Sequence, residues 1–263
     1  MPYLTKIPIN PRRRSSIRLL GNPHLIHGAV SAGFLTDPRD ERLLWRIDAP
    51  DQLRPSLIVL SKTLPDYTHI WKDYGWPETE AAKPVSKDYT PLLTRLEVGQ
   101  EYRFRLVANP VQHLRHPQKP TEAQQRRQRS WDSQTGTAAE RKVRGHRVEH
   151  RTAAHQRNWL ISKAASCGFL IPEIEHDAHT ILDQAPGTTA QTDHQVALIE
   201  RRRLHFRKRR DTEPIKIASA TFEGRLRITD LEPFKQALLQ GIGPAKAYGQ
   251  GLLTLAPLPT AGA

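Results

Sequence analysis

The sequence predicts an α+β protein built from two small units in tandem, and three observations support this fold class. Residues 1–112 order their apolar runs as strand, helix, two strands, helix and strand, which is the βαββαβ order of a ferredoxin-like unit. Residues 113–142 change to glutamine, arginine, threonine and proline. Residues 143–258 return to helical and extended patterns, so the 263 residues fit two units of roughly 100 residues each.

The elements of the first unit follow from side-chain periodicity and a helix start signal. Glu101–Asn109 alternates most regularly, with aromatic and aliphatic side chains opposite Arg103 and Arg105, as expected of a half-buried strand. Asn22 followed by Pro23 predicts a helix start. An asparagine side chain can accept a hydrogen bond from the free N–H groups of the first turn, and proline is tolerated there because the N–H that it lacks would have no partner within the helix. The other expected elements are strands at Tyr3–Ile9, Leu43–Asp48 and Ser56–Ser61 and a weaker helix near Asp66–Tyr74.

The middle of the chain is predicted to be a flexible basic linker. Residues 113–142 carry too few apolar side chains to bury the surface that ordering requires. The second unit then begins. Its expected elements are a helix at Ala153–Ser166, an extended segment at Phe169–Glu175, a hairpin within Gln195–Arg210, strands within Ile215–Thr229, a helix at Leu231–Gln240 and a last strand at Leu252–Leu255.

The charge balance indicates the kind of partner. Lysine and arginine number 40 against 27 aspartate and glutamate, a net charge of +13, and a polyanion is the natural complement. No apolar run approaches the ~18 residues of a membrane span, and the N-terminus lacks a secretory signal. The single cysteine, Cys167, excludes an internal disulfide and a cysteine-built metal site. We expect a cytoplasmic nucleic-acid-binding protein that is monomeric when isolated, with no membrane partner and no cofactor.

Two arginine clusters are candidate nucleic-acid contacts. In the hairpin segment, Arg201–Arg203 and the basic run 207–210 flank Leu204–Phe206, with apolar residues at strand spacing. Arginine binds phosphate or a guanine edge with two parallel hydrogen bonds. The alternative is a solvated basic loop. The second cluster lies just before the predicted helix start and consists of Arg12, Arg13, Arg14 and Arg18.

The helix that starts at Asn22 carries two histidines on one side. At 100° per residue, His24 and His27 share a face, while Leu25 and Ile26 lie on the other. A helix N-terminus and nearby cations both favour the neutral imidazole, the form that a general base needs. Either histidine could instead be an incidental surface or core residue among the 12 in the chain.

Metal and nucleotide-hydrolysis motifs are not evident in the sequence. The pair His146 and His150 has i,i+4 spacing but lacks the order of a zincin motif. The chain ends in a glycine-rich loop, Gly241–Gly251, that contains Lys246. Such a loop can present N–H groups to phosphate oxygens, although glycine-rich loops alone are weak indicators. No metal site is predicted.

Several segments together resemble the CasE endoribonucleases of type I-E CRISPR systems. They are Thr5-Lys-Ile with Asn10-Pro11, Asn22-Pro23-x-x-x-His27, Tyr102-Arg-Phe-Arg-Leu-Val-Ala-Asn-Pro110, Phe222-Glu-Gly-Arg-Leu-Arg-Ile228 and the loop from Gly241 to Pro257. The resemblance covers both ends and the middle of the chain, and the C-terminal motif is its most specific part.

The resemblance implies two tandem ferredoxin-like, RNA-recognition-motif-like domains, the second with an arginine-rich hairpin that enters the RNA groove. It also implies metal-independent cutting of CRISPR repeat RNA at the base of its stem-loop and retention of the product within the Cascade complex. The family's catalytic histidine matches His27. Where the family commonly has tyrosine, this chain has His24, which is the second candidate catalytic residue and whose role stays open.

The expected chemistry is attack by the RNA 2′-hydroxyl, giving a 2′,3′-cyclic phosphate and a free 5′-hydroxyl, with His27 as acid or base. Two alternatives are a non-catalytic structural RNA-binding subunit and a ribosome-associated RNA-binding protein, the latter leaving the C-terminal motif unexplained. The expected RNA contacts are Arg12, Arg13, Arg14, Arg18, Arg147, Arg201, Arg202, Arg203, Arg207, Lys208, Arg209, Arg210, Gly243, Lys246 and Gly249.

Overall fold

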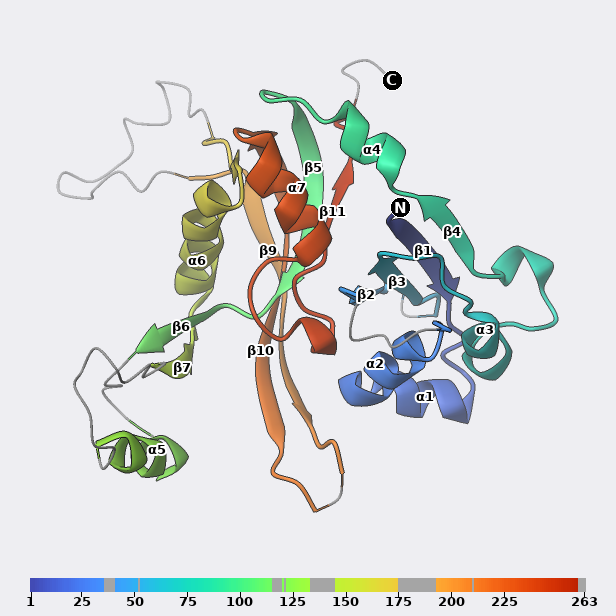
Figure 1. Cartoon of the computed structure of the whole chain (residues 1–263), viewed down its shortest axis with the longest axis horizontal. Helices are drawn as coiled ribbons and strands as arrows, with labels where there is room; N and C mark the ends of the chain where they lie inside the picture. The colour runs from blue at the N-terminus through green and yellow to red at the C-terminus, as the bar shows by residue number, and fades with distance from the viewer. Residues whose placement is uncertain are drawn as a thin grey trace.

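The first unit is an antiparallel sheet with strand order β2-β3-β1-β4 (Figure 1). The computed structural model describes residues 1–35, 41–51, 53–114, 120, 122–132, 145–174, 193–209 and 211–259. Its strands are β1 (Tyr3–Pro8), β2 (Leu44–Asp48), β3 (Ser56–Ser61) and β4 (Val85–Asp88). This order is the ferredoxin-like arrangement expected from the sequence.

Three helices cover one face of this sheet: α1 (Arg14–Leu20), α2 (Pro23–Ser31) and α3 (Thr68–Tyr74). The core beneath them joins Ile7 and Trp45 of the sheet to Ile26 of α2 and Ile70 of α3, all almost fully buried. The sequence did not predict the helix α1, because it is rich in exposed arginine and buries only two side chains, Ser16 and Leu19, which form no clear apolar stripe. A one-turn helix, η1 (Glu80–Ala82), precedes β4, and α4 (Thr90–Arg95) follows it.

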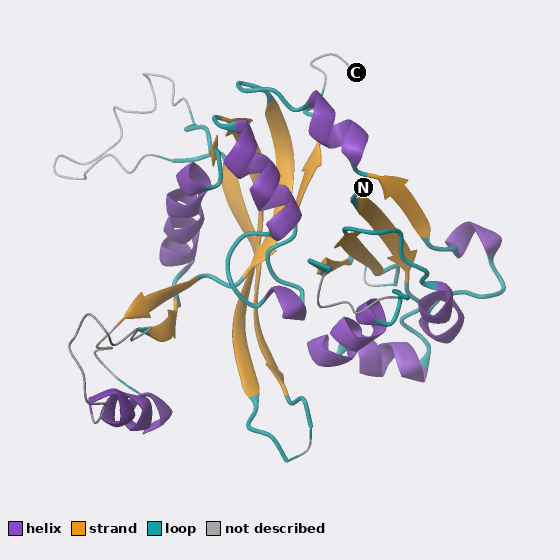
Figure 2. Ribbon diagram, viewed as in Figure 1, coloured by secondary structure: helices purple, strands orange, loops and turns teal. Residues whose placement is uncertain are grey.

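The second unit repeats the ferredoxin-like arrangement, which confirms the predicted fold class. Its sheet has the order β11-β5-β10-β8, and β9 also pairs with β10. The helices of this unit pack against the sheet (Figure 2); Trp159 of one stacks on Phe222 at 6.5 Å between ring centroids. The elements are β5 (Glu101–Ala108), α6 (Ala153–Ser166), β8 (Phe169–Leu170), β9 (Val196–Phe206), β10 (Ile215–Ile228), α7 (Leu231–Gln240) and β11 (Leu253–Ala256).

The strand at 101–108 lies in the second sheet, so the expectation that it closes the first unit is wrong. β5 pairs with β10 and β11, and the fourth strand of the first sheet is β4. β4 has the sequence Val-Ser-Lys-Asp and is largely exposed, so it lacks the alternation that identifies β5 in the sequence. The change from first to second sheet therefore falls between β4 and β5, before residue 112.

The segment predicted to be a linker contains regular structure. β6 (Val111–Leu114) pairs with β7 (His146–Glu149), and α5 (Glu122–Asp132) lies between them in the chain. The helix α5 is polar on every side, so it offers no apolar stripe from which a helix could be predicted. Residues 115–119, 121 and 133–144 lie outside the described part of the chain.

The second face of the first sheet is covered by the second unit. Leu44 and Leu60, on the face opposite the helices, belong to the same buried cluster as Phe104, Leu252 and Leu253 of the second unit. Side chains alternate along a strand, so Trp45 and Leu44 enter the two different cores. The open face on which a single RNA-recognition motif stacks bases is therefore closed here.

Candidate functional site

The candidate site begins at α2, whose start is the predicted one. The Asn22 side chain accepts a hydrogen bond from the His24 N–H at 2.9 Å, and Pro23 occupies the first turn. His24 and His27 are both half-buried. Nδ1 of His27 is buried and has no hydrogen-bond partner among the described residues. This leaves Nε2 as the imidazole nitrogen able to reach a ligand.

The electrostatics of His27 favour the neutral ring. Burial lowers the pKa of His27, and the neighbouring imidazole of His24 and the ammonium of Lys208 lower it further. The sequence suggested that the arginines before α2 would supply the nearby cations. The cation that acts is instead Lys208, which follows β9 in the second unit. The charge of a group at the hairpin tip therefore acts on the helix that carries His27.

The segment Gln195–Arg210, predicted to contain a hairpin, instead contains one long strand, β9, whose hairpin partner β10 lies beyond that segment. The pair β9–β10 extends away from the body of the second sheet (Figure 1). Its three strand arginines have protein acceptors. Arg201 donates to the Gln156 side chain at 3.1 Å and to the Arg151 carbonyl, Arg202 pairs with Glu200 at 2.5 Å, and Arg203 pairs with Glu149 at 3.4 Å. Arg207, Lys208 and Arg209 at the turn are exposed, and Arg210 lies outside the described residues.

The arginine cluster before α2 divides into exposed and structural members. Arg13 donates to the carbonyls of Lys72 and Gly75, at 2.7 and 3.4 Å, and so ties the start of α1 to the end of α3. Arg12, Arg14 and Arg18 are exposed, as is Arg147 on β7. Arg13 therefore has a structural role, whereas the sequence pattern grouped it with the arginines expected to contact RNA.

The glycine-rich loop is built for internal packing. A Cβ on Gly249 would lie 2.6 Å from the Trp45 ring, and one on Gly243 would lie 3.0 Å from the Trp159 ring. Gly249 is buried, and burial against Trp45 does not fit the predicted RNA contact. Lys246 is half-buried, and its pKa is lowered by burial and by Arg42. The short helix η3 (Lys246–Tyr248) in this loop contacts α2, so the loop supports the helix that carries His27.

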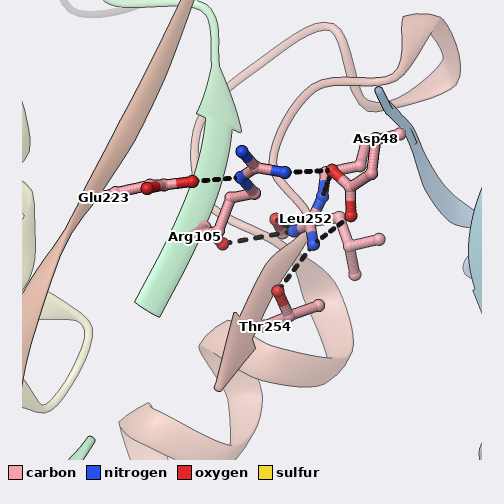
Figure 3. Close-up of polar contacts among 6 residues, drawn as sticks. Asp48, Arg105, Glu223, Leu252 and Thr254 are labelled. Carbon is pink, nitrogen blue, oxygen red and sulfur yellow. Dashed lines mark hydrogen bonds and ion pairs between the residues drawn. The ribbon is translucent and has the colours of Figure 1, made fainter. Parts of the chain in front are cut away.

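An ion-pair network that sequence reasoning missed joins the two units (Figure 3). Arg46 of β2 forms two parallel hydrogen bonds with Asp48, at 2.7 and 2.9 Å. Asp48 also accepts from Arg105 of β5, whose Nε contacts Glu223 of β10 at 2.5 Å. The surrounding guanidinium groups lower the pKa of Asp48 although burial opposes them.

Within the described ranges, no three histidine, cysteine, aspartate or glutamate side chains are grouped to hold a metal ion. In the same part of the chain, no helix is long and apolar enough to cross a membrane.

The fold and the site define a class: a basic protein of two ferredoxin-like units, with a histidine pair on one unit and a cationic hairpin tip from the other beside it. The chain belongs to the CRISPR-associated protein family, whose model matches residues 2–257. This family membership confirms the resemblance inferred from the sequence motifs.

Named relatives and a solved structure agree with this assignment. The chain is 28% identical to the CRISPR-associated endoribonuclease Cse3 of Thermus thermophilus, over 97% of this chain and 100% of that protein. It is 28% identical to the CRISPR system Cascade subunit CasE of Escherichia coli, over 82% and 89%. A structure of Thermus thermophilus Cse3 bound to an RNA representing a pre-cleavage complex has a TM-score of 0.69 at 28% identity, covering 97% of this chain and 99% of that one.

Proposed function

We propose that this protein is a metal-independent endoribonuclease that cleaves CRISPR repeat RNA at the base of its stem-loop to make guide RNA. One observation carries the proposal: Phe206 at the end of β9 packs on Tyr248 of η3, with ring centroids 4.9 Å apart, and η3 contacts α2, so the cationic hairpin end lies near the helix that carries His27. Burial, His24 and Lys208 lower the pKa of His27, which favours the neutral imidazole. This arrangement combines an acid/base group with a positive charge at the tip of an RNA-binding arm. The RNA-bound Cse3 structure, which shares the fold, supports the same assignment.

The reaction needs a base, an acid and a positive charge. Nε2 of His27 accepts the proton of the 2′-hydroxyl, and the 2′-oxygen then forms a bond to the scissile phosphorus. The bond from phosphorus to the 5′-oxygen breaks, and that oxygen takes a proton from the second imidazole, His24. The products are a 2′,3′-cyclic phosphate and a 5′-hydroxyl. The Lys208 ammonium stabilises the negative charge that develops on the phosphate oxygens.

The hairpin and the exposed arginines supply affinity for the RNA. The deep, narrow major groove of A-form RNA resists side-chain readout, so the hairpin is expected to contact the stem where the groove opens near its end. Arg207, Lys208 and Arg209 are placed at the tip for this contact, and Arg12, Arg14 and Arg18 flank the catalytic helix. We also propose that the protein stays bound to its RNA product within a Cascade complex in the cytoplasm. A relative that is named as a Cascade subunit supports this part of the proposal.

The test is a single-turnover cleavage assay on repeat RNA in EDTA. Wild type is expected to cut and His27→Ala to lose roughly 10²–10⁴-fold in rate, with binding retained. His113→Ala, an exposed histidine on β6, is the matched control and should cut normally. Cleavage that requires a divalent metal, or a fully active His27→Ala, would overturn the mechanism. Tight binding without any cleavage by wild type would instead indicate a structural RNA-holding subunit.

The identity of the nucleophile has its own test. A repeat RNA with a 2′-deoxy nucleotide immediately before the cut lacks the attacking hydroxyl, so it should bind normally and remain intact. The ends of the cleaved natural RNA should be a 2′,3′-cyclic phosphate and a 5′-hydroxyl. Normal cleavage of the deoxy substrate would exclude attack by the 2′-hydroxyl.

A further inference from the structure

Arg46 is a buried arginine whose hydrogen-bonding capacity is fully used. The residue is 4% exposed, and a guanidinium group has five N–H donors. Nε and one N–H of Nη2 bond to the Asp48 carboxylate, at 2.7 and 2.9 Å. The other N–H of Nη2 donates to the Thr254 hydroxyl at 2.7 Å. Nη1 donates to two backbone carbonyls, those of Arg105 and Leu252, each at 3.2 Å.

The acceptors of Arg46 tie the two units together at several points. Asp48 lies on the same strand as Arg46, whereas Arg105, Leu252 and Thr254 all belong to the second unit. Through Asp48 and Arg105 the contacts continue to Glu223 on β10. Because the guanidinium is planar and its donors point in fixed directions, satisfying all of them restricts the orientation of the two sheets, not only their distance.

The network ends close to the point where the hairpin leaves the sheet, since β10 pairs with β5 only from Ala220 onward. The β9–β10 register shifts between Thr221 and Phe222, and Glu223 is the next residue along β10. A bulge bends a strand and increases its twist, so the direction of the hairpin is set near this point. The hairpin tip carries Lys208, whereas His27 lies on the first unit. Their juxtaposition therefore depends on how the two units are fixed to each other.

We propose that Arg46 is a positioning residue for the cleavage reaction: it locks the two units in the orientation that brings the hairpin tip to the helix of His27. The inference rests on the proposed function. A buried ion pair is commonly no better for stability than apolar packing, so a network of this kind is better explained by the orientation it imposes. Arg46 touches neither His27 nor Lys208, and its effect passes through the sheets.

The first test measures the orientation without RNA. Cysteines for spin labels are introduced at Ile17 of α1 and His205 of β9, which are both exposed, and Cys167 is replaced by serine. The distance between the two labels then reports how the helix layer lies relative to the hairpin. Arg46→Lys keeps the charge but cannot make the bonds of the planar group, so the distance distribution should broaden or shift. Arg54→Lys is the matched control, since Arg54 is 87% exposed at its side chain, and should leave the distribution unchanged.

The second test separates rate from affinity in the unlabelled full chain. At saturating repeat RNA, Arg46→Lys should cut about 10²-fold more slowly, as expected for a misplacement of about 1 Å in a catalytic site. Its Kd for the uncut 2′-deoxy RNA should change less than threefold, and Arg54→Lys should match wild type in both. Circular dichroism confirms that each variant is folded. Arg46→Lys is used because Arg46→Met would remove one of the two arginines that pair with Asp48.

The outcomes distinguish this inference from the proposed function. An unchanged rate, an unchanged distance distribution, or a Kd weakened as much as the rate would each overturn the positioning role of Arg46. A wild-type protein that binds but does not cut would overturn the proposed function, and the distance measurement would still decide whether Arg46 fixes the two units.

Discussion

Replacing Gly249 by alanine should destabilise the protein through backbone strain and a steric clash with Trp45. Gly249 has φ of +76°, and an added Cβ would lie 2.6 Å from the Trp45 ring. The left-handed backbone costs an alanine about 1–2 kcal/mol, and forcing a methyl group into a packed core costs about 1–3 kcal/mol more. The expected loss is therefore about 2–5 kcal/mol, a large part of the roughly 5–15 kcal/mol that stabilises a typical fold.

The matched control is Gly99→Ala. Gly99 has φ of +87°, and nothing lies within 4 Å of an added Cβ. It therefore carries only the backbone cost of about 1–2 kcal/mol. Urea unfolding followed by tryptophan fluorescence measures both free energies of unfolding. Equal losses for the two variants would refute the packing of Gly249 against Trp45.

Three further predictions follow from the site and the network. The variant Lys208→Gln removes a cation that lowers the pKa of His27, so that pKa should rise. Because a general base acts in its deprotonated form, the acidic limb of the pH–rate profile should move to higher pH. An unchanged profile would place Lys208 outside the site. Gly28→Ala fills open space on α2 and should raise the free energy of unfolding by about 0.5–1 kcal/mol in urea melts; a loss would contradict this. Asp48→Asn leaves Arg46 buried without its counter-charge and should cost about 3–5 kcal/mol. The pKa of Asp48 is lowered on folding, so the stabilisation that Asp48 gives the protein is complete above its pKa in the unfolded chain, ~3.9, and is lost as the pH falls through its pKa in the folded protein. Equal acid sensitivity in wild type and Asp48→Asn would refute that contribution.

Local patterns predicted the elements with strong alternation or clear caps. The Asn22 cap and the helix at α7 have signals that lie within a few neighbouring residues, and the structure contains both of them. β4 was missed because an exposed strand of four residues carries little alternation. The helix α5 was missed because it has no apolar face.

The site could be predicted only where its parts are adjacent in the sequence. His24 and His27 lie one helical turn apart, so their shared face follows from periodicity. The charge of Lys208 acts on His27 from the other unit, and Arg46 bonds to Thr254 across 208 residues of chain. Such pairs depend on how the sheets pack, which no local pattern contains. The glycines were expected to approach RNA, but the aromatic rings that they approach belong to the protein itself.

The closed face of the first sheet has a consequence for folding cooperativity. Leu44 and Leu60 are buried in a cluster to which Leu252, Leu253 and other residues of the second unit contribute. A fragment that ended after β4 would present this apolar face to water and would be prone to aggregate. The two units should therefore unfold in one transition, since neither completes its interior alone.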